Sequence, residues 1–150
     1  MRFLIVLPAR LGHGVSKSKE VAVERKTYTV EGLTKAGTYS HVVEAGGLLF
    51  VSGMLPVDQV KDVQIHDDIA RATELVLDNI ARALAAAGSG LPHVVKVTVF
   101  LADMASFADM NAVYQRFFPE CPPARSCVAV KSIPGGFPLE MEAVAVKPEG

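Results

Sequence analysis

The chain has 150 residues, of which 50% are hydrophobic, and this predicts one domain with a sizeable core. A formal net charge of −1 gives no global field that would attract nucleic acid or an anionic membrane. Two cysteines, Cys121 and Cys127, cannot form a disulfide framework, and they indicate a reducing compartment.

The first residues do not read as a targeting segment. Their apolar run, residues 3–7, ends at Pro8, whereas a secretory signal carries about 7–15 apolar residues. No stretch approaches the ~18 apolar residues of a membrane span. We therefore predict a cytoplasmic protein with no membrane partner, with an N-terminal extension over residues 1–20 and a single domain over residues 21–150.

The first half of the chain predicts strands followed by a helix. Strands are expected over residues 27–30, 41–45 and 48–52, and the last two are joined by a tight turn at residues 46–47, Gly-Gly. Apolar residues then recur at helical spacing after a capping aspartate until Gly88, which ends the predicted helix.

The second half predicts a strand, a helix and two further strands. The strand covers residues 94–101, and Ser106 with Asp109 resembles a capping box at the start of the helix. The last two strands start near Ala124 and Leu139. Alternation along the first of these three strands predicts an apolar face made of Val95, Val97, Val99 and Leu101.

This order of elements predicts an α+β fold, a mixed sheet with two helices packed on one face. The other face should then carry apolar side chains interrupted by Arg125 and Glu140, namely Val94, Phe100, Ala129, Val144 and Val146. Such a face is too apolar for water and too polar for the core of a monomer. We therefore expect the chain to associate with copies of itself.

Charged side chains on the last two strands are the candidate site. Arg125 shares one side of its strand with Cys127, and Glu140 shares a side with Glu142. If the two strands pair, a guanidinium that grips a carboxylate and a glutamate that polarises water can converge on one surface. The alternative is a structural salt bridge between strands, which spacing alone favours because most charged pairs are structural.

Several motifs together resemble one known family. Residues 123–128 read Pro-Ala-Arg-Ser-Cys-Val and residues 139–141 read Leu-Glu-Met, which is similar to the signature of the RidA/YjgF family of imine deaminases. Other segments follow in the family's order, namely residues 38–41, 49–56, 68–69, 79–80, 87–88, 95–101, Asn111 and 114–118. The resemblance spans residues 38 to 146.

The resemblance implies a chorismate-mutase-like (YjgF) fold, a homotrimer and sites in the clefts between neighbouring subunits. It implies hydrolysis of 2-imino acids or their enamine tautomers, of the 2-iminobutanoate and 2-iminopropanoate class, to 2-keto acids and ammonia. Arg125 would bind the substrate carboxylate, while Glu140 and the backbone carbonyl of Cys127 would orient water. The other substrate-binding residues that it implies are Tyr39, Gly53 and Asn111. Neither a cofactor nor a metal is implied.

Three departures leave the substrate open. His41 and Met54 stand where the family has glutamine, and Thr38 stands where it has proline. Another enamine, such as aminoacrylate or an aminomuconate, is one alternative, and a non-catalytic module that binds keto acids is a second. Some family members are described as single-strand RNA endonucleases or translation inhibitors, but this chain has no tryptophan and no basic stripe, so nucleic acid is not the expected partner.

A purely structural role also stays open for each of the other candidate residues. Tyr39 could be an aromatic that closes the core at the end of a strand, and Gly53 could simply serve a turn. Asn111 could be a surface amide. Cys127 could be a small buried hydrophobe.

Overall fold

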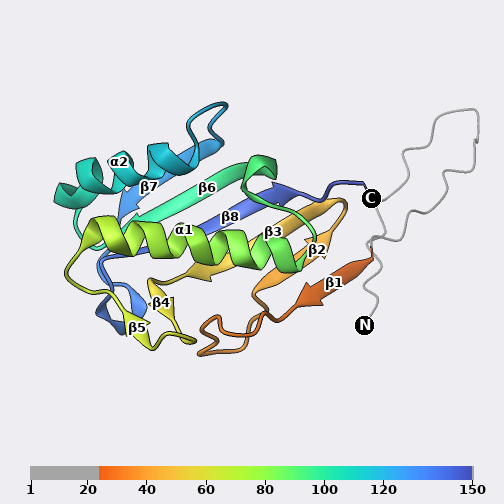
Figure 1. The fold of residues 1–150 in the computed structure, drawn as a ribbon, viewed down its shortest axis with the longest axis horizontal. Helices are drawn as coiled ribbons and strands as arrows, with labels where there is room; N and C mark the ends of the chain where they lie inside the picture. The colour runs from red at the N-terminus through yellow and green to blue at the C-terminus, as the bar shows by residue number, and fades with distance from the viewer. Residues whose placement is uncertain (1–23, 150) are drawn as a thin grey trace, which may run out of the picture.

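The computed structural model describes residues 24–149, which form a six-stranded mixed sheet and a short two-stranded ribbon (Figure 1). The strands of the sheet are β1 (Arg25–Tyr28), β2 (Val42–Ala45), β3 (Leu48–Met54), β6 (Val94–Leu101), β7 (Ala124–Ala129) and β8 (Leu139–Val146). Their spatial order is β1-β2-β3-β8-β6-β7, and only β6 and β7 run parallel. The ribbon pairs β4 (Val57–Asp58) with β5 (Val63–Gln64).

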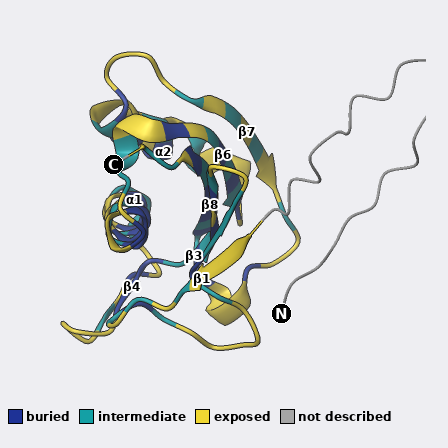
Figure 2. Cartoon of the chain, turned by 90° about the vertical axis from the view of Figure 1, so that its right-hand side faces the viewer, coloured by how far each residue is buried: buried dark blue, intermediate teal, exposed yellow. Residues whose placement is uncertain are grey.

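Two helices, α1 (Ile69–Ala86) and α2 (Phe107–Phe117), cover one face of the sheet, as the order of elements predicts (Figures 1 and 2). The carboxylate of Asp68 accepts a hydrogen bond from the Arg71 amide at 3.0 Å and caps α1. Gly88, with φ +75°, follows the helix end. Within residues 24–149, no helix combines the length and the apolar character that crossing a bilayer requires.

The core lies between α1 and the sheet. Its main cluster forms where the apolar stripe of α1 packs on the side chains that β3, β6 and β8 direct toward the helices. A second, small cluster joins Val57, Ile133 and Phe137. The fully or almost fully buried members of the main cluster include Val76, Leu77, Ile80 and Leu84 of α1 together with Leu49, Val97, Val99, Leu139 and Met141 of the sheet. Burial of such a continuous apolar layer is the main stabilising contribution to a domain of this size.

The β2–β3 hairpin turns at two glycines, as predicted. Gly46 and Gly47 have φ of 58° and 77°, a conformation that other residues rarely adopt. Pairing continues beyond β2, since the Ser52 amide donates to the His41 carbonyl at 3.0 Å. This hairpin carries Gly53 to the end of β3, next to β8.

The predicted apolar face of β6 is correct from Val97 onward and wrong at Val95. The pairing of β6 with β8 shifts between Val94 and Lys96, so the alternation of side chains slips by one position there. Val94 is consequently buried, which also removes it from the predicted open face. Val95 is 44% exposed.

The predicted capping box of α2 is also wrong. The Ser106 side chain makes no capping hydrogen bond. A turn of 3₁₀ helix, η2 (Met104–Ser106), precedes α2, and the Asp103 carboxylate accepts from the Ala105 amide there at 2.9 Å. The chain therefore starts the helical segment one turn earlier than the sequence pattern suggests.

No described element covers the second face of the sheet (Figure 2). It exposes Phe50, Val128 and Val146, each more than 40% accessible. Ala129 and Arg125, predicted for this face, lie on the other one, because they pair with Leu101 and Val97 of β6, whose side chains point to the helices. The face is apolar as expected, but Glu140 stands on it without Arg125.

Candidate active site

Arg125 and Glu140 lie on opposite faces of the sheet. Strand β6 separates β7 from β8, so the two strands do not pair. Arg125 is opposite the fully buried Val97, on the helix side, whereas Glu140 is opposite Phe100, on the open side. The expectation that both groups converge on one surface of one chain is therefore wrong.

The Arg125 guanidinium is held by α2. Its Nη1 donates to Asn111 Oδ1 at 2.8 Å, and its Cζ lies 4.6 Å and 5.5 Å from the ring centroids of Tyr114 and Phe107. Within residues 24–149, no carboxylate forms an ion pair with it. Arg125 lines a cavity of about 660 Å³, and within the described residues its other N–H donors make no hydrogen bond, so they can bind an anion there.

Cys127 lies on the same strand as Arg125, β7, and its backbone carbonyl is the group of interest. The Val130 amide donates to the Leu101 carbonyl at 2.9 Å, so even-numbered residues of β7 direct their backbone groups at β6. Backbone groups alternate along a strand, and β7 is the last strand of the sheet; the carbonyl of Cys127 therefore points to the open edge. Burial raises the pKa of the Cys127 thiol despite the opposing effect of Arg125, which does not favour a thiolate nucleophile.

Glu140 occupies space that Gly53 leaves empty. A Cβ atom at position 53 would lie 1.8 Å from Glu140 Oε1. The pairing of β3 with β8 is irregular between Val51 and Met54, and this bulge brings the backbone of Gly53 under the carboxylate. The missing side chain of Gly53 thus makes room for the Glu140 carboxylate.

A cavity of about 300 Å³ adjoins Glu140 and Gly53, and its walls are mostly apolar. Tyr39 lines it from the rim and is 37% exposed, so it does not close the core. The Tyr39 hydroxyl donates to the Thr34 carbonyl at 3.0 Å and accepts from the Ala36 amide at 3.3 Å, and its ring lies in an edge arrangement with the ring of His41. Burial, and secondarily the charge of Glu142, raise the pKa of the Glu140 carboxyl.

The predicted site residues therefore divide into two groups. Arg125 and Asn111 line one cavity, and Tyr39, Gly53 and Glu140 line another. The first group carries the positive charge of Arg125 and the second carries the negative charge of Glu140. The first can bind a carboxylate but has no anionic side chain to activate water, and the second has the anion but no cation to bind a carboxylate.

Sequence reasoning missed the aromatic support of Arg125. Phe107, Asn111 and Tyr114 stand at i, i+4 and i+7 of α2, a spacing that places them on one side of the helix. This spacing, followed by an arginine in the next strand, is the sequence pattern that could have predicted the contact of these three side chains with Arg125. The described part of the chain contains no cluster of three or more histidine, cysteine or acidic side chains that could hold a metal ion.

We expect the ring of Tyr114, not its hydroxyl, to matter. Burial raises the pKa of Tyr114 to about 12, and within the described residues the buried hydroxyl has no hydrogen-bond partner. Tyr114→Phe should therefore leave the free energy of unfolding unchanged or raise it by about 1 kcal/mol. Tyr114→Leu removes a cation–π contact worth about 0.5–2 kcal/mol and should loosen Arg125. Denaturant unfolding and ligand affinity measured on both variants check this, and a loss of affinity in Tyr114→Phe equal to that in Tyr114→Leu would contradict it.

The model of the Endoribonuclease L-PSP family matches residues 29–147. The chain belongs to this family, also called YjgF/RidA. Among curated relatives of this YjgF/RidA chain, protein HMF1 of Saccharomyces cerevisiae is 44% identical over 112 residues, which are 75% of this chain and 86% of HMF1. The crystal structure of the YjgF gene product from E. coli superposes with a TM-score of 0.77 at 35% identity, covering 82% of this chain and 99% of that one.

A third relative bears on the compartment. Protein MMF1 of Saccharomyces cerevisiae, named as mitochondrial, is 41% identical over 112 residues, which are 75% of this chain and 77% of MMF1. Names within the family therefore do not point to one compartment, and the cytoplasmic location stays a prediction. The N-terminal extension predicted over residues 1–20 lies outside the described residues.

Proposed function

We propose that this YjgF/RidA chain is a hydrolytic deaminase that converts 2-imino acids and their enamine tautomers to 2-keto acids and ammonia. We further propose that its site forms between copies of the chain in a homotrimer. The observation that carries both proposals is the division of the site residues into a cationic and an anionic group on opposite faces of one sheet. The cationic group can bind the substrate carboxylate and the anionic group can activate water, so each supplies the function that the other lacks.

The cationic group suits the carboxylate of the substrate. A guanidinium binds a carboxylate through two parallel hydrogen bonds, which fixes the carbon next to it in space. Arg125 is pre-positioned for this by Asn111 and Tyr114, so little side-chain freedom is lost on binding. Fixing the electrophilic carbon is the larger part of the expected rate gain, since alignment alone can contribute about 7–11 kcal/mol in ideal cases.

The anionic group suits the water. In the proposed reaction the substrate is the protonated imine, and Glu140 accepts a proton from water while the water oxygen bonds to the imine carbon, which leaves a neutral amine on that carbon. Glu140 then gives this proton to the amine and accepts the proton of the new hydroxyl as the C–N bond breaks, so ammonia leaves and a C=O bond remains. The proton left on Glu140 passes to the ammonia or to solvent. The Cys127 carbonyl at the open edge of β7 is the second acceptor for this water.

Association of copies follows from the surface as well as from the site. The second sheet face, which also carries Glu140, exposes Phe50, Val128 and Val146, and a monomer rarely leaves such a face in water. Closed rings place the same two surfaces in contact at every interface. In a trimer each interface can then join the Arg125 group of one copy to the Glu140 group of the next.

The pH dependence of the rate tests the role of Glu140. Only the ionised carboxylate accepts from water, so kcat/KM should fall as the pH drops through its raised pKa, above the ordinary glutamate value of 4.5. Glu142→Gln removes one cause of that increase and should move the acid limb to lower pH while the plateau stays the same. The pH profiles of kcat/KM should be measured for the wild type and for Glu142→Gln. An acid limb at the same pH in both proteins would contradict this assignment.

Two other functions remain to be separated by experiment. The family model carries the description endoribonuclease, and RNA cleavage should then be accompanied by strongly salt-dependent RNA binding. A binding module would hold 2-keto acids through Arg125 without turnover. Glu140 favours catalysis, because an anion beside the site weakens the binding of a carboxylate.

The direct test generates imines from a panel of amino acids with an amino-acid oxidase and traps the unhydrolysed fraction with semicarbazide. We expect the protein to lower the semicarbazone yield from at least one imino acid, at a rate proportional to protein concentration. The panel should include enamines such as aminoacrylate. An unchanged yield across the whole panel would contradict the proposed function.

A further inference from the structure

The loop between β1 and β2, residues 30–39, builds one wall of the cavity beside Glu140. We refer to it as the pocket loop. It supplies several of the residues that line the cavity, namely Leu33, Thr34, Ala36, Gly37 and Tyr39. The shape of the cavity therefore depends on how this loop is held.

His41 lies two residues beyond the end of the loop and is 1% exposed. The Val30 amide donates to His41 Nδ1 at 2.8 Å, so Nδ1 is an acceptor and carries no proton. The neutral ring then has its proton on Nε2, which donates to the Thr34 carbonyl at 3.1 Å. One side chain thus binds the loop at its beginning and at its middle.

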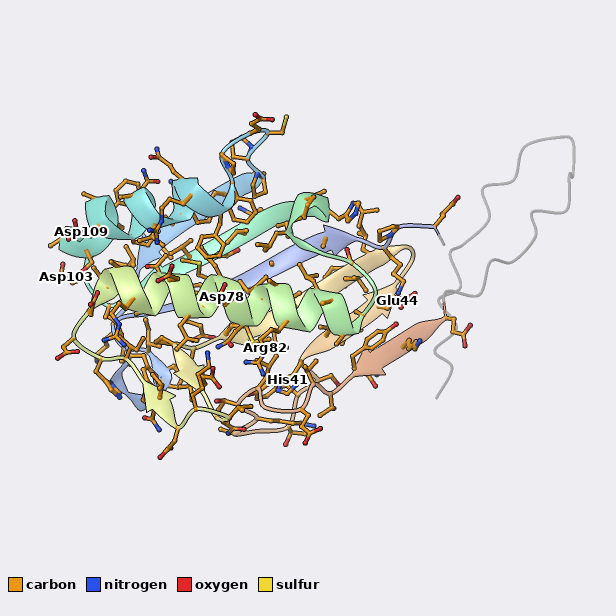
Figure 3. All side chains as sticks on the ribbon, viewed as in Figure 1. His41, Glu44, Asp78, Arg82, Asp103 and Asp109 are labelled. Carbon is orange, nitrogen blue, oxygen red and sulfur yellow. The ribbon has the colours of Figure 1, made fainter. Side chains whose placement is uncertain are left out.

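Other contacts anchor the same unit. The His41 carbonyl accepts from the Ser52 amide, which fixes its backbone to β3. Arg82 of α1 donates through Nη2 to the Glu31 carbonyl at 3.5 Å, and its Nη1 donates to Asn79. Figure 3 shows the side chains of His41 and Arg82 below α1, on the side of the pocket loop.

We propose that His41 is a positioning residue for the deaminase reaction: its Nε2–H tautomer ties the pocket loop together and keeps the Glu140 cavity in its binding shape. This inference rests on the proposed function. An amide side chain offers the same pair of groups as this tautomer, one acceptor and one donor, whereas an apolar side chain offers neither. A histidine that only filled the core would be replaceable by any apolar side chain of similar volume.

The test compares two substitutions of similar size. His41→Gln keeps an acceptor for Val30 and a donor for Thr34, whereas His41→Leu keeps the volume and removes both. We expect His41→Gln to retain the slow hydrogen exchange of the Val30 amide and a KM within about twofold of the wild type. We expect His41→Leu to lose that protection and to raise KM roughly tenfold with kcat nearly unchanged, because the loop is then competent only part of the time while Arg125 and Glu140 stay in place.

The imidazole itself provides a readout that packing would not change. Nitrogen-15 shifts of the wild-type ring should show the Nε2–H tautomer. If His41→Leu does not fold, the ring tautomer of the wild type and the exchange rate of the Val30 amide in His41→Gln still test the inference.

Three results would overturn the inference: the opposite tautomer, unchanged Val30 protection in His41→Leu, or a KM in His41→Gln as high as in His41→Leu. Exchange and tautomer measurements need no turnover. If the wild type hydrolyses no imine but these measurements come out as expected, the proposed function fails while the role of His41 in holding the loop stands. The affinity for 2-keto acids is then compared among the variants instead of KM.

Discussion

Arg125→Ala is expected to lower kcat/KM for imine hydrolysis on the order of a thousandfold and to abolish 2-keto acid binding. The reason is that a hydrogen-bonded charge pair is lost, which costs about 2–5 kcal/mol. Arg125→Lys should restore little, because an ammonium cannot reproduce the planar, two-point contact with a carboxylate or the stacking on Tyr114. Keto-acid affinity and deaminase rates measured on both variants give the result.

The partner substitution separates an enzyme from a binding module. Glu140→Gln keeps the shape of the side chain but accepts from water less strongly, so kcat should fall about a hundredfold or more while keto-acid affinity is kept. Affinity can even increase, since one negative charge leaves the cavity. A wild type that binds keto acids through Arg125 but hydrolyses no imine, or a Glu140→Gln variant that keeps the wild-type kcat, would contradict the catalytic assignment.

Gly53→Ala is expected to lower kcat about a hundredfold with a smaller change in stability. The new Cβ would stand 1.8 Å from Glu140 Oε1 and 2.8 Å from its Cδ, so the carboxylate must move by an ångström or more. A displacement of about 1 Å at a reacting group can cost a factor near 10² in rate.

Gly90→Ala is the matched control. A Cβ there would meet only Pro92 within 4 Å, at an ordinary contact distance of 3.6 Å, and Gly90 lines neither cavity. Steady-state kinetics and thermal unfolding should be recorded on both alanine variants. If Gly53→Ala keeps full kcat, Glu140 does not need its present position, and the proposed role of its carboxylate is wrong.

Much of this molecule could be predicted from local sequence. The glycine pair of the β2–β3 turn, the aspartate before α1 and the apolar spacing within α1 each act over a few residues, and each was confirmed. The motifs around Arg125 and Glu140 likewise point to the family through the identity and order of their residues alone.

The arrangement of the site could not be predicted in the same way. Side-chain alternation tells which residues of one strand share a face, but not which face of the sheet that is. The answer depends on β7 pairing in parallel with β6, and on a register that sets Arg125 opposite Val97 and Glu140 opposite Phe100. Pairings between distant segments leave no trace in a short pattern. The shift of register that exposes Val95 could not be predicted for the same reason.

The central claim is that a complete site takes Arg125 from one copy and Glu140 from another, and subunit mixing tests it most directly. Arg125→Ala and Glu140→Gln, each nearly inactive alone, should be unfolded together, refolded at equal concentration and confirmed as mixed trimers by native mass spectrometry. Random assembly of a ring then places an intact arginine beside an intact glutamate at about one site in four, so about a quarter of the wild-type activity should return. Mixed trimers that remain as inactive as their parents would show that each site is built within a single chain.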